Sequence, residues 1–236
     1  MRMVLLGAIV VAAGKGTRMG TKESKQYLKV GGKPILVHTL EKFQRADIVG
    51  EIVLVVGADD VALCEGYREQ YGLDKIKAIV TGGGERQFSV HAGLLRSKAE
   101  WVLVHDGVRP FVASDLMARC WEAAERFGGA VAAVPVKDTI KEADSDGRVA
   151  ATPDRSRLWA VQTPQAFRRE SLIQAHETAF RDGFVGTDDA SIAERVGIPV
   201  HIVHGDYGNI KITTPDDLEW AEFRLSKEAG KEGALN

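Results

Sequence analysis

Apolar runs recur along the chain, and most of them are followed by a segment in which apolar residues have helical spacing. The runs lie at residues 5–11, 52–56, 76–80, 101–104 and 130–136. The helical segments lie at residues 34–43, 59–71, 89–97 and 114–127. Strands that are apolar on both faces are typical of a parallel sheet covered by helices on both sides. The alternation therefore predicts a doubly wound, mostly parallel α/β sheet.

The alternation breaks between residues 138 and 157, where the chain is polar. Residues 139–143 and 148–151 flank Ser145-Asp146-Gly147, and an Asp-Gly pair between short strands is typical of a hairpin turn. An isolated two-stranded ribbon is only marginally stable in water. We therefore expect residues 138–157 to be an inserted β-hairpin arm that packs on another surface, with a second subunit of a homodimer as the natural candidate.

Beyond the arm the pattern predicts shorter elements. They are strands at 159–162, 200–203 and 209–212, a helix at 170–181, a short helix capped by Thr187 and a last helix that begins at Thr214-Pro215. A threonine cap, a proline at the first helical position and acids in the first turn all favour that last start. Because no repeat or linker is visible, we expect residues 1–236 to form a single domain that carries the arm as an insertion.

Composition narrows the functional classes. The chain has 236 residues and a formal net charge of −2, which gives no reason to expect nucleic acid or an anionic membrane as a partner. Its two cysteines are too few for a disulfide framework or a zinc site. No apolar run approaches the ~20 residues of a membrane span, and nothing at the N-terminus resembles a signal peptide. We therefore expect a cytoplasmic protein.

The first apolar run leads into a glycine-rich, basic loop. The loop reads Ala12-Ala13-Gly14-Lys15-Gly16-Thr17-Arg18-Met19, and Lys22 and Lys25 follow. Small residues let backbone amides approach a ligand and form an anion nest at the carboxyl end of a strand. The loop therefore predicts a triphosphate site, and a solvated basic loop is the alternative. Met19 at the third glycine position excludes a dinucleotide fingerprint, and Thr21 in place of lysine excludes a Walker A loop.

Two later strand ends carry further candidate chemistry. Gly82-Gly83-Gly84 and Ser89 suit recognition of a base or ribose, although a glycine turn before a helix needs no ligand. Asp106 and Arg109 follow the next strand. An aspartate that leaves a buried strand beside a triphosphate loop is well placed to hold Mg²⁺, which prefers carboxylate, water and phosphate oxygens.

Three more residues complete the set of candidates. Thr139 and Thr163 stand at two further predicted strand ends. Lys211 lies in an apolar segment, where a cation is costly unless it is paired or faces the site; an edge lysine that reaches solvent is the alternative. None of the six histidines forms a base–nucleophile pattern. A phosphate nucleophile is already ionised, so positioning and charge neutralisation can suffice.

Together these stretches resemble the 2-C-methyl-D-erythritol 4-phosphate cytidylyltransferase family. The motifs are AAGKGTRM, KQYL, GGGERQFSV, HDGVRPF, PVKDTIK, LWAVQTPQAF, TDDAS and GNIKITTPDD, within residues 8–217. The resemblance implies a Rossmann-like fold and a homodimer clasped by the arms. It also implies CMP transfer from CTP to methylerythritol phosphate, with release of pyrophosphate, in the non-mevalonate isoprenoid pathway.

The resemblance further implies a role for each candidate residue. Catalytic roles fall to Arg18, Lys25 and Lys211. Nucleotide binding falls to Ala12, Ala13, Gly14, Lys15, Gly16, Gly83, Gly84, Ser89 and Asp106. Binding of the polyol phosphate falls to Asp106, Arg109, Thr139, Thr163 and Lys211, with Arg155 reaching it from the arm of the other subunit, and Asp106 is also the Mg²⁺ ligand. Gly84 departs from the family, which often has Asp or Asn there; little is lost if that contact is made by the backbone.

Three alternatives stay open. A ribitol-5-phosphate cytidylyltransferase shares these motifs, but Ala12-Ala13-Gly14 and Thr187–Ser191 favour methylerythritol phosphate. A non-catalytic nucleotide-binding protein is disfavoured because Arg18, Lys25, Asp106 and Lys211 occur together. A dehydrogenase is disfavoured by the lack of an acid at the end of the second run, where Gly57 stands.

Overall fold

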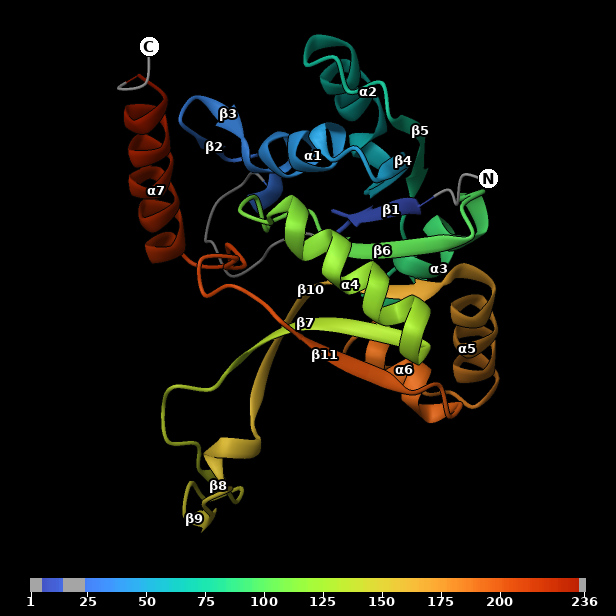
Figure 1. The fold of residues 1–236 in the computed structure, drawn as a ribbon, viewed down its shortest axis with the longest axis vertical. Coiled ribbons are helices and arrows are strands. Elements are labelled where there is room, and N and C mark those ends of the chain that lie inside the picture. The colour runs from blue at the N-terminus through green and yellow to red at the C-terminus, as the bar shows by residue number, and fades with distance from the viewer. Residues whose placement is uncertain (1–5, 15–23, 234–236) are drawn as a thin grey trace.

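The structure of the protein is a computed structural model that describes residues 6–14 and 24–233 (Figure 1). Its strands are β1 (Leu6–Val11), β2 (Lys29–Val30), β3 (Lys33–Pro34), β4 (Val49–Val56), β5 (Ile76–Thr81), β6 (Trp101–Asp106), β7 (Gly129–Pro135), β8 (Glu142–Ala143), β9 (Val149–Ala151), β10 (Trp159–Arg168) and β11 (Val200–His204). Its α-helices are α1 (Ile35–Arg45), α2 (Val61–Gln70), α3 (Arg86–Arg96), α4 (Ser114–Phe127), α5 (Arg169–Arg181), α6 (Asp189–Arg195) and α7 (Pro215–Gly233). Short 3-10 turns are η2 (Lys25–Tyr27), η3 (Ala58–Asp60) and η4 (Arg155–Arg157).

Seven of the strands form one sheet in the order β11-β7-β10-β6-β1-β4-β5. All neighbouring pairs in this sheet are parallel except the two that involve β10. β1 lies in the interior of the sheet between β4 and β6. The prediction of a mostly parallel sheet is confirmed.

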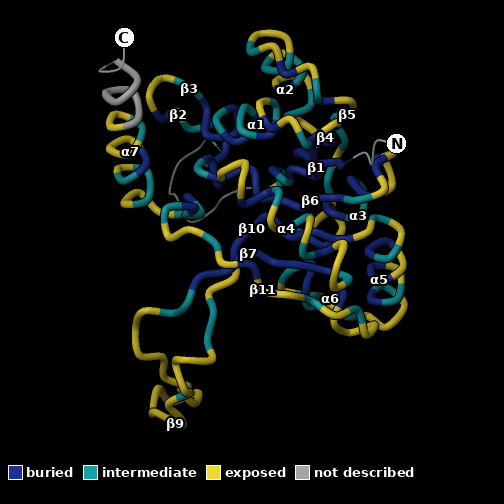
Figure 2. Tube along the Cα trace, viewed as in Figure 1, coloured by how far each residue is buried: buried dark blue, intermediate teal, exposed yellow. Residues whose placement is uncertain are grey.

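Helices cover both faces of this sheet. On one face Leu6, Ala8 and Val10 of β1 share a core with α1, α2 and α4. On the other face Ile9 belongs to a second core with α3, α5 and α6. Figure 2 shows the buried strands between helices whose outer surfaces are exposed. Each central strand is covered twice, which explains why its sequence is apolar and does not alternate.

A third apolar cluster holds α7 against the rest of the chain. Its buried members are Val30, Ile35, Val108, Ile212 and Ala221. Both carboxylate oxygens of Glu222 on α7 accept a hydrogen bond of 3.1 Å from the backbone N–H of Gly31, between β2 and β3. The helix thereby fixes the β2–β3 hairpin and the extended segment before α7 relative to the sheet.

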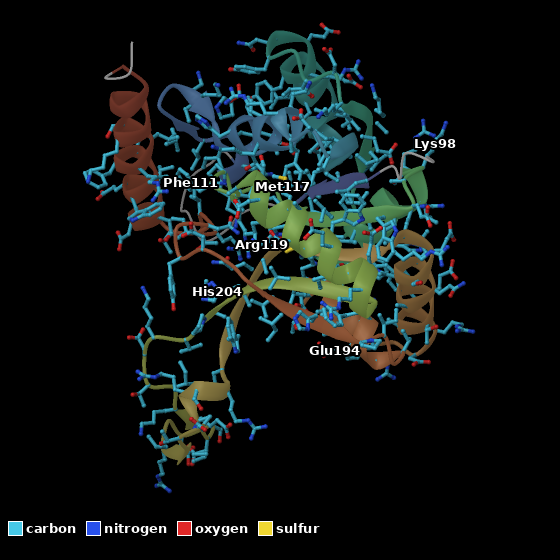
Figure 3. The ribbon with its side chains drawn as sticks, viewed as in Figure 1. Lys98, Phe111, Met117, Arg119, Glu194 and His204 are labelled. Carbon is cyan, nitrogen blue, oxygen red and sulfur yellow. The ribbon has the colours of Figure 1, made fainter. Side chains whose placement is uncertain are left out.

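α4 connects the interior of the sheet to its β11 edge. Met117 and Cys120 on α4 are fully buried. On the same helix, Arg119 Nη1 donates a hydrogen bond of 2.7 Å to the carbonyl of His204 at the end of β11 (Figure 3). This hydrogen bond fixes the end of β11, the strand that precedes the extended segment before α7.

The arm leaves the sheet between β7 and β10 and projects away from it (Figure 1). β8 and β9 pair antiparallel, and Gly147 in the turn has φ of +79°, a conformation that favours glycine. The predicted hairpin is therefore confirmed. Residues 137–152 are all exposed (Figure 2), including Val149 at 62%.

Two strand predictions after the arm were wrong. β10 does not end at Gln162 but continues to Arg168, and its pairing with β7 shifts register between Val161 and Gln165. Thr163-Pro164 lies at this irregularity, and a proline cannot donate to a ladder, which is why the sequence read as a strand end. Residues 209–212 form no strand: Asn209 N–H donates to Asp206 O in a turn, and the segment runs on extended.

Helix starts also differ in part. The N-cap of α6 is Asp188 and not Thr187, because Asp188 Oδ1 accepts a hydrogen bond of 2.9 Å from Ser191 N–H. α3 begins at Arg86, before the predicted start at Ser89. The start of α7 is confirmed: its first residue is Pro215, preceded by the predicted threonine cap.

We expect Gly93→Ala to destabilise the protein, because a Cβ at Gly93 would lie 2.5 Å from Ile9 Cγ2 and 3.0 Å from Val55 Cγ2. Overpacking of this kind costs about 1–3 kcal/mol. Gly66→Ala in α2 is the matched control, since nothing lies within 4 Å of its added Cβ. Alanine is the better helix former by about 0.8–1.0 kcal/mol. Urea denaturation should show free energies of unfolding that change in opposite directions; a stabilised Gly93→Ala protein would contradict the close contact of α3 with the sheet.

Candidate active site

The candidate residues gather at one edge of the sheet. β1, β5 and β6 end there, and residues 162–165 in the middle of β10, which is antiparallel to β6, lie beside the end of β6. Backbone hydrogen bonds continue the ladder into the loops: Ala12 N–H to Val55 O at 2.7 Å and Gly107 N–H to Val11 O at 2.8 Å. The loops after β1 and β6 therefore start from fixed positions side by side.

A cavity of about 420 Å³ opens at this edge. It is lined by Val11, Ala12, Ala13, Gly14, Lys25, Gln26, Gly83, Gly84, Glu85, Arg86, Ser89, Asp106, Val108 and Lys211. The structure thus brings together every predicted nucleotide-binding residue that it describes. Lys15, Gly16 and Arg18 lie outside the described residues.

The glycine turn after β5 closes one wall of this cavity. A Cβ at Gly82 would lie 2.5 Å from Ala13 Cβ, so only glycine permits this approach of the two loops. Ser89 Oγ accepts a hydrogen bond of 3.2 Å from Gly83 N–H and donates one of 3.2 Å to Glu85 O. The Ser89 hydroxyl therefore shapes the turn. At Gly84 an added Cβ would meet nothing within 4 Å.

The loop after β1 and η2 form another wall of the cavity. Gln26 is buried, and its Nε2 donates to Ala12 O at 2.8 Å and to Gly14 O at 3.2 Å. These bonds hold the glycine loop against η2. Lys25, the neighbour of Gln26, lines the cavity. The sequence motif that contains Gln26 signalled this position, but not its structural role.

Asp106, the last residue of β6, is surrounded by three cations. Its Oδ2 lies 2.9 Å from Lys211 Nζ and 3.5 Å from Arg109 Nε. Its Oδ1 lies 3.3 Å from Arg86 Nε. Lys211 was predicted to be paired or to face the site; it does both, although its segment is not a strand. We call Arg86, Asp106, Arg109 and Lys211 the Asp106 cluster.

These contacts decide the charge of the carboxylate. Burial by itself would raise the pKa of Asp106, but the charges of Arg86, Lys211 and Arg109 outweigh it and hold that pKa well below its ordinary value. Asp106 is therefore ionised throughout the physiological range. It can accept hydrogen bonds or bind a cation, but it cannot act as an acid.

His105 and Thr163 fix this carboxylate from behind. Thr163 Oγ1 accepts a hydrogen bond of 3.1 Å from Asp106 N–H and lies 2.9 Å from His105 Nδ1. His105 Nε2 lies 3.2 Å from the carbonyl of Arg109, which can only accept, so Nε2 carries the proton and the Thr163 hydroxyl donates to Nδ1. Burial lowers the pKa of His105 to about 4, so the ring is neutral at pH 7. Thr163 thus positions neighbouring groups through hydrogen bonds that its hydroxyl already makes.

A second cavity, of about 300 Å³, lies next to the first. It is lined by Arg86, Asp106, Arg109, Val161, Gln162, Thr163, Gln165, Thr187, Asp188 and Lys211. Arg109, Thr163 and Lys211, which were predicted to bind one substrate, therefore line one cavity. Arg86, Asp106 and Lys211 line both cavities, so the two spaces meet at the Asp106 cluster.

Two predicted residues are not brought to either cavity within one chain. Thr139 and Arg155 lie in the exposed arm. Arg155, for which the sequence suggested no local partner, donates from Nη1 to Lys137 O at 2.6 Å. Conversely, sequence reasoning gave no role to Arg86, although its place directly after the glycine turn was a usable signal.

The donor set limits what metal ion can bind. Within residues 6–14 and 24–233 no three His, Cys, Asp or Glu side chains are placed to hold a metal ion together. Among the described residues, Asp106 is the carboxylate that borders both cavities, and both of its oxygens face cations. Mg²⁺ commonly binds through one or two carboxylates with water and substrate phosphates. The site therefore fits a Mg²⁺ that arrives on a phosphorylated substrate.

A glycine-rich loop and a cationic cluster at the carboxyl edge of a doubly wound sheet define a nucleotide-binding α/β enzyme of the nucleotidyltransferase class. The model of the 2-C-methyl-D-erythritol 4-phosphate cytidylyltransferase family matches residues 6–227. The chain belongs to this family. None of the helices it forms in the described ranges is long and apolar enough to cross a membrane.

Individual relatives agree over nearly the whole chain. The 2-C-methyl-D-erythritol 4-phosphate cytidylyltransferase of Syntrophus aciditrophicus is 50% identical over 95% of this chain and 97% of its own length. That of Geobacter metallireducens is 48% identical over 94% and 97%. The crystal structure of 4-diphosphocytidyl-2C-methyl-D-erythritol synthase from Anaerococcus prevotii has a TM-score of 0.83 at 34% identity, covering 95% of this chain and 99% of that one.

Asp106→Asn should destabilise the protein, because it leaves three buried or half-buried cations without their common carboxylate. Removing one partner of a buried ion pair costs about 3–5 kcal/mol. Since the folded-state pKa of Asp106 is depressed, its contribution is complete above the unfolded-state pKa of about 3.9 and is lost as the pH falls through the folded-state pKa.

The difference in free energy of unfolding between wild type and Asp106→Asn should therefore be constant from about pH 7 to about pH 5 and shrink only below about pH 4. Denaturant titrations across this range measure it. A difference that has already faded near about pH 6 would show that the carboxylate is not held by the three cations.

Proposed function

We propose that the protein transfers CMP from CTP to 2-C-methyl-D-erythritol 4-phosphate, which gives 4-diphosphocytidyl-2-C-methyl-D-erythritol and pyrophosphate. The observation that carries the proposal is the meeting of two cavities at Arg86, Asp106 and Lys211. One cavity has glycine-rich walls suited to a nucleotide, and the other is small and polar. Joining two phosphorylated substrates requires this kind of shared cationic border, because it holds both reactants and neutralises their charge.

The reaction is a displacement at the α-phosphorus of CTP. A phosphate oxygen of the acceptor, ionised at neutral pH, forms the new P–O bond while the bond to pyrophosphate breaks and its electron pair leaves with pyrophosphate. No proton has to be removed from the nucleophile, so no general base is needed. His105 is unsuited to that role, since both of its ring nitrogens are engaged in hydrogen bonds.

The cationic side chains have separate proposed roles in binding the substrates and stabilising the transition state. Lys25 and Lys211 line the nucleotide cavity, where they would stabilise charge on the transferred phosphoryl group and on the leaving pyrophosphate. Arg18 has the same proposed role and lies outside the described residues. Arg109 would bind the phosphate of the acceptor in the second cavity. Asp106 would be the protein ligand of a Mg²⁺ bound to the triphosphate, and that ion would neutralise part of the triphosphate charge.

A pyrophosphate-release assay with CTP and Mg²⁺ tests the proposal against the ribitol alternative, which differs in the acceptor alone. We expect release with 2-C-methyl-D-erythritol 4-phosphate, and much less with ribitol 5-phosphate or when ATP or GTP replaces CTP. Equal or faster release with ribitol 5-phosphate would overturn the choice of acceptor.

The proposed compartment is the cytoplasm, where CTP is available, and neither nucleic acid nor a membrane takes part.

The cytosine base has a proposed contact surface on the two glycine-rich loops. The backbone amides of Ala13, Gly14 and Gly84 donate no hydrogen bond to another described residue. They border the same cavity as Ser89. Small residues on both sides leave room for a pyrimidine, and backbone groups can read its polar edge. The glycine at 84 is compatible with this reading, because the contact uses the amide.

Gly84→Asn should change the Kd for CTP by no more than about twofold, because the added side chain enters open space. Gly83→Ala is the matched variant, since its Cβ would collide with Phe88 Cβ and displace the turn. It should weaken binding by about tenfold, as expected for roughly 1.4 kcal/mol of overpacking. Calorimetric titration with CTP measures both constants. The base pocket is misassigned if Gly83→Ala binds CTP as tightly as the wild type.

The acceptor site is proposed to be completed by a second copy of the chain. The arm is exposed along residues 137–152 and has too few apolar residues for a core of its own. Arg155 uses Nη1 in the bond to Lys137 O, while a guanidinium has five donors in all. In a homodimer the arm would cross to the partner and deliver Arg155, and with it Thr139, to the partner's second cavity. Guanidinium suits a phosphate through paired hydrogen bonds.

Arg155→Ala should raise KM for the acceptor by roughly tenfold to a hundredfold, the value of a lost charge-assisted contact of about 1.5–3 kcal/mol. KM for CTP should hardly change. Arg148→Ala, also exposed in the arm, is the control and should resemble the wild type.

Mixing Arg155→Ala with Lys25→Ala protein then tests whether the residue acts across the dimer. Each mixed dimer contains one site with both residues intact, so part of the activity should return. If subunits are shown to exchange and no activity returns, Arg155 does not serve the partner's site.

A further inference from the structure

A strip of unpaired polar atoms runs inward from the Asp106 cluster. Among the described residues, Arg86 Nη2, Asp189 Oδ1, His91 Nε2 and both ring nitrogens of His176 are buried and make no hydrogen bond. These residues contact one another in turn. Arg86 contacts Asp189, Asp189 contacts His176, and the rings of His176 and His91 are stacked with their centroids 6.0 Å apart. Buried polar atoms without partners are costly, so a contiguous group of them beside a cavity calls for a functional explanation.

Arg86 occupies a position that helix stability does not favour. It is the first residue of α3, where the helix dipole disfavours a cation. Two carboxylates nevertheless hold it there: Nε lies 3.3 Å from Asp106 Oδ1, and Nη1 lies 2.8 Å from Asp189 Oδ2. Its third nitrogen, Nη2, remains unpaired, and Arg86 borders both cavities.

Asp189 is itself fixed by its surroundings. It is fully buried in the first turn of α6, and its backbone N–H donates to Gln165 Oε1 at 3.1 Å. His176 Nε2 lies 3.4 Å from Asp189 Oδ1, and neither atom makes a hydrogen bond. A fully buried carboxylate is tolerated only with a charged partner, and Arg86 is that partner. The pair therefore orients the guanidinium plane, since Nη1 and Nε are both held.

The geometry points to Asp189 as a positioning residue that, backed by His176, holds Arg86 at the junction of the two cavities so that its guanidinium donates to a phosphate oxygen of a bound substrate. This inference rests on the proposed function. The phosphate is that of the nucleotide or that of the acceptor, since Arg86 borders both spaces. Asp189 touches neither substrate and acts through Arg86.

A double-mutant cycle tests this inference with Asp189→Asn, Arg86→Gln and the double variant. Each single change should lower kcat/KM on the order of 10²-fold, the effect of displacing a reacting group by about 1 Å. The kcat/KM of the double variant should be no lower than that of the less active single variant, because Asp189 affects the substrate only through Arg86. Asp182→Asn is the matched control: Asp182 pairs with Arg195 at 2.9 Å, but both side chains are exposed, and its kcat/KM should equal that of the wild type.

Binding measurements identify the phosphate and separate this inference from the proposed function. A higher Kd for CTP alone, measured by calorimetry, assigns the Arg86 contact to the nucleotide, and a higher KM for the acceptor assigns it to the acceptor phosphate. If kcat falls while Kd for CTP and KM for the acceptor are unchanged, the contact is to the phosphoryl group that is transferred. If the wild type makes no product, the proposed function fails, while the cycle on Kd for CTP still tests the coupling of Asp189 to Arg86.

Circular dichroism and thermal unfolding establish that each variant is folded. If Asp189→Asn does not fold, Asp189→Glu keeps the charge but moves the carboxylate, and it should lose on the order of tenfold in kcat/KM. The inference is overturned if a folded Asp189 variant keeps kcat/KM, and Kd for CTP, within about twofold of the wild type. It is also overturned if the losses of the two single variants multiply in the double variant.

Discussion

The buried carboxylate of Asp106 is the constraint on which the site depends. A carboxylate at 7% exposure is unstable without compensation, and three cations compensate it. They come from separate parts of the chain: the start of α3, the loop after β6 and the segment before α7. The Asp106 carboxylate therefore holds side chains from three segments at the end of β6. The same three cations leave the site positively charged overall, which suits two phosphorylated substrates.

The sheet and the C-terminal helix prepare this meeting point. β1 and β6 are neighbours, so the glycine loop and Asp106 start side by side. α7 packs through Ala221 on the cluster that contains Ile212, the residue after Lys211, and Glu222 ties it to the β2–β3 hairpin. Lys25 precedes that hairpin closely in the chain. The helix thus fixes both lysines from outside the site without contributing a group to it.

The sequence predicted much of this arrangement, because apolar runs and glycine turns report local physics. The central strands, the arm and the gathering of most candidate residues at one edge of the sheet were anticipated. What it missed depends on tertiary contacts. The antiparallel course of β10 is hidden by Thr163-Pro164, which resembles a strand end. The Arg86–Asp189 pair joins residues far apart in the chain, and no local pattern marks it. The bonds that the Thr163 hydroxyl makes with His105 and Asp106 were not predicted either.

The most direct test of the account is a crystal structure of the protein with Mg²⁺, 2-C-methyl-D-erythritol 4-phosphate and a CTP analogue that cannot be cleaved between the α- and β-phosphates. The account predicts the cytidine between the loops at Ala13 and Gly84 and the acceptor in the cavity bordered by Arg109. An acceptor phosphate oxygen should lie about 3–3.5 Å from the α-phosphorus, beside the Asp106 cluster. A nucleotide bound elsewhere, or an acceptor phosphate separated from the α-phosphorus by the cluster, would contradict it.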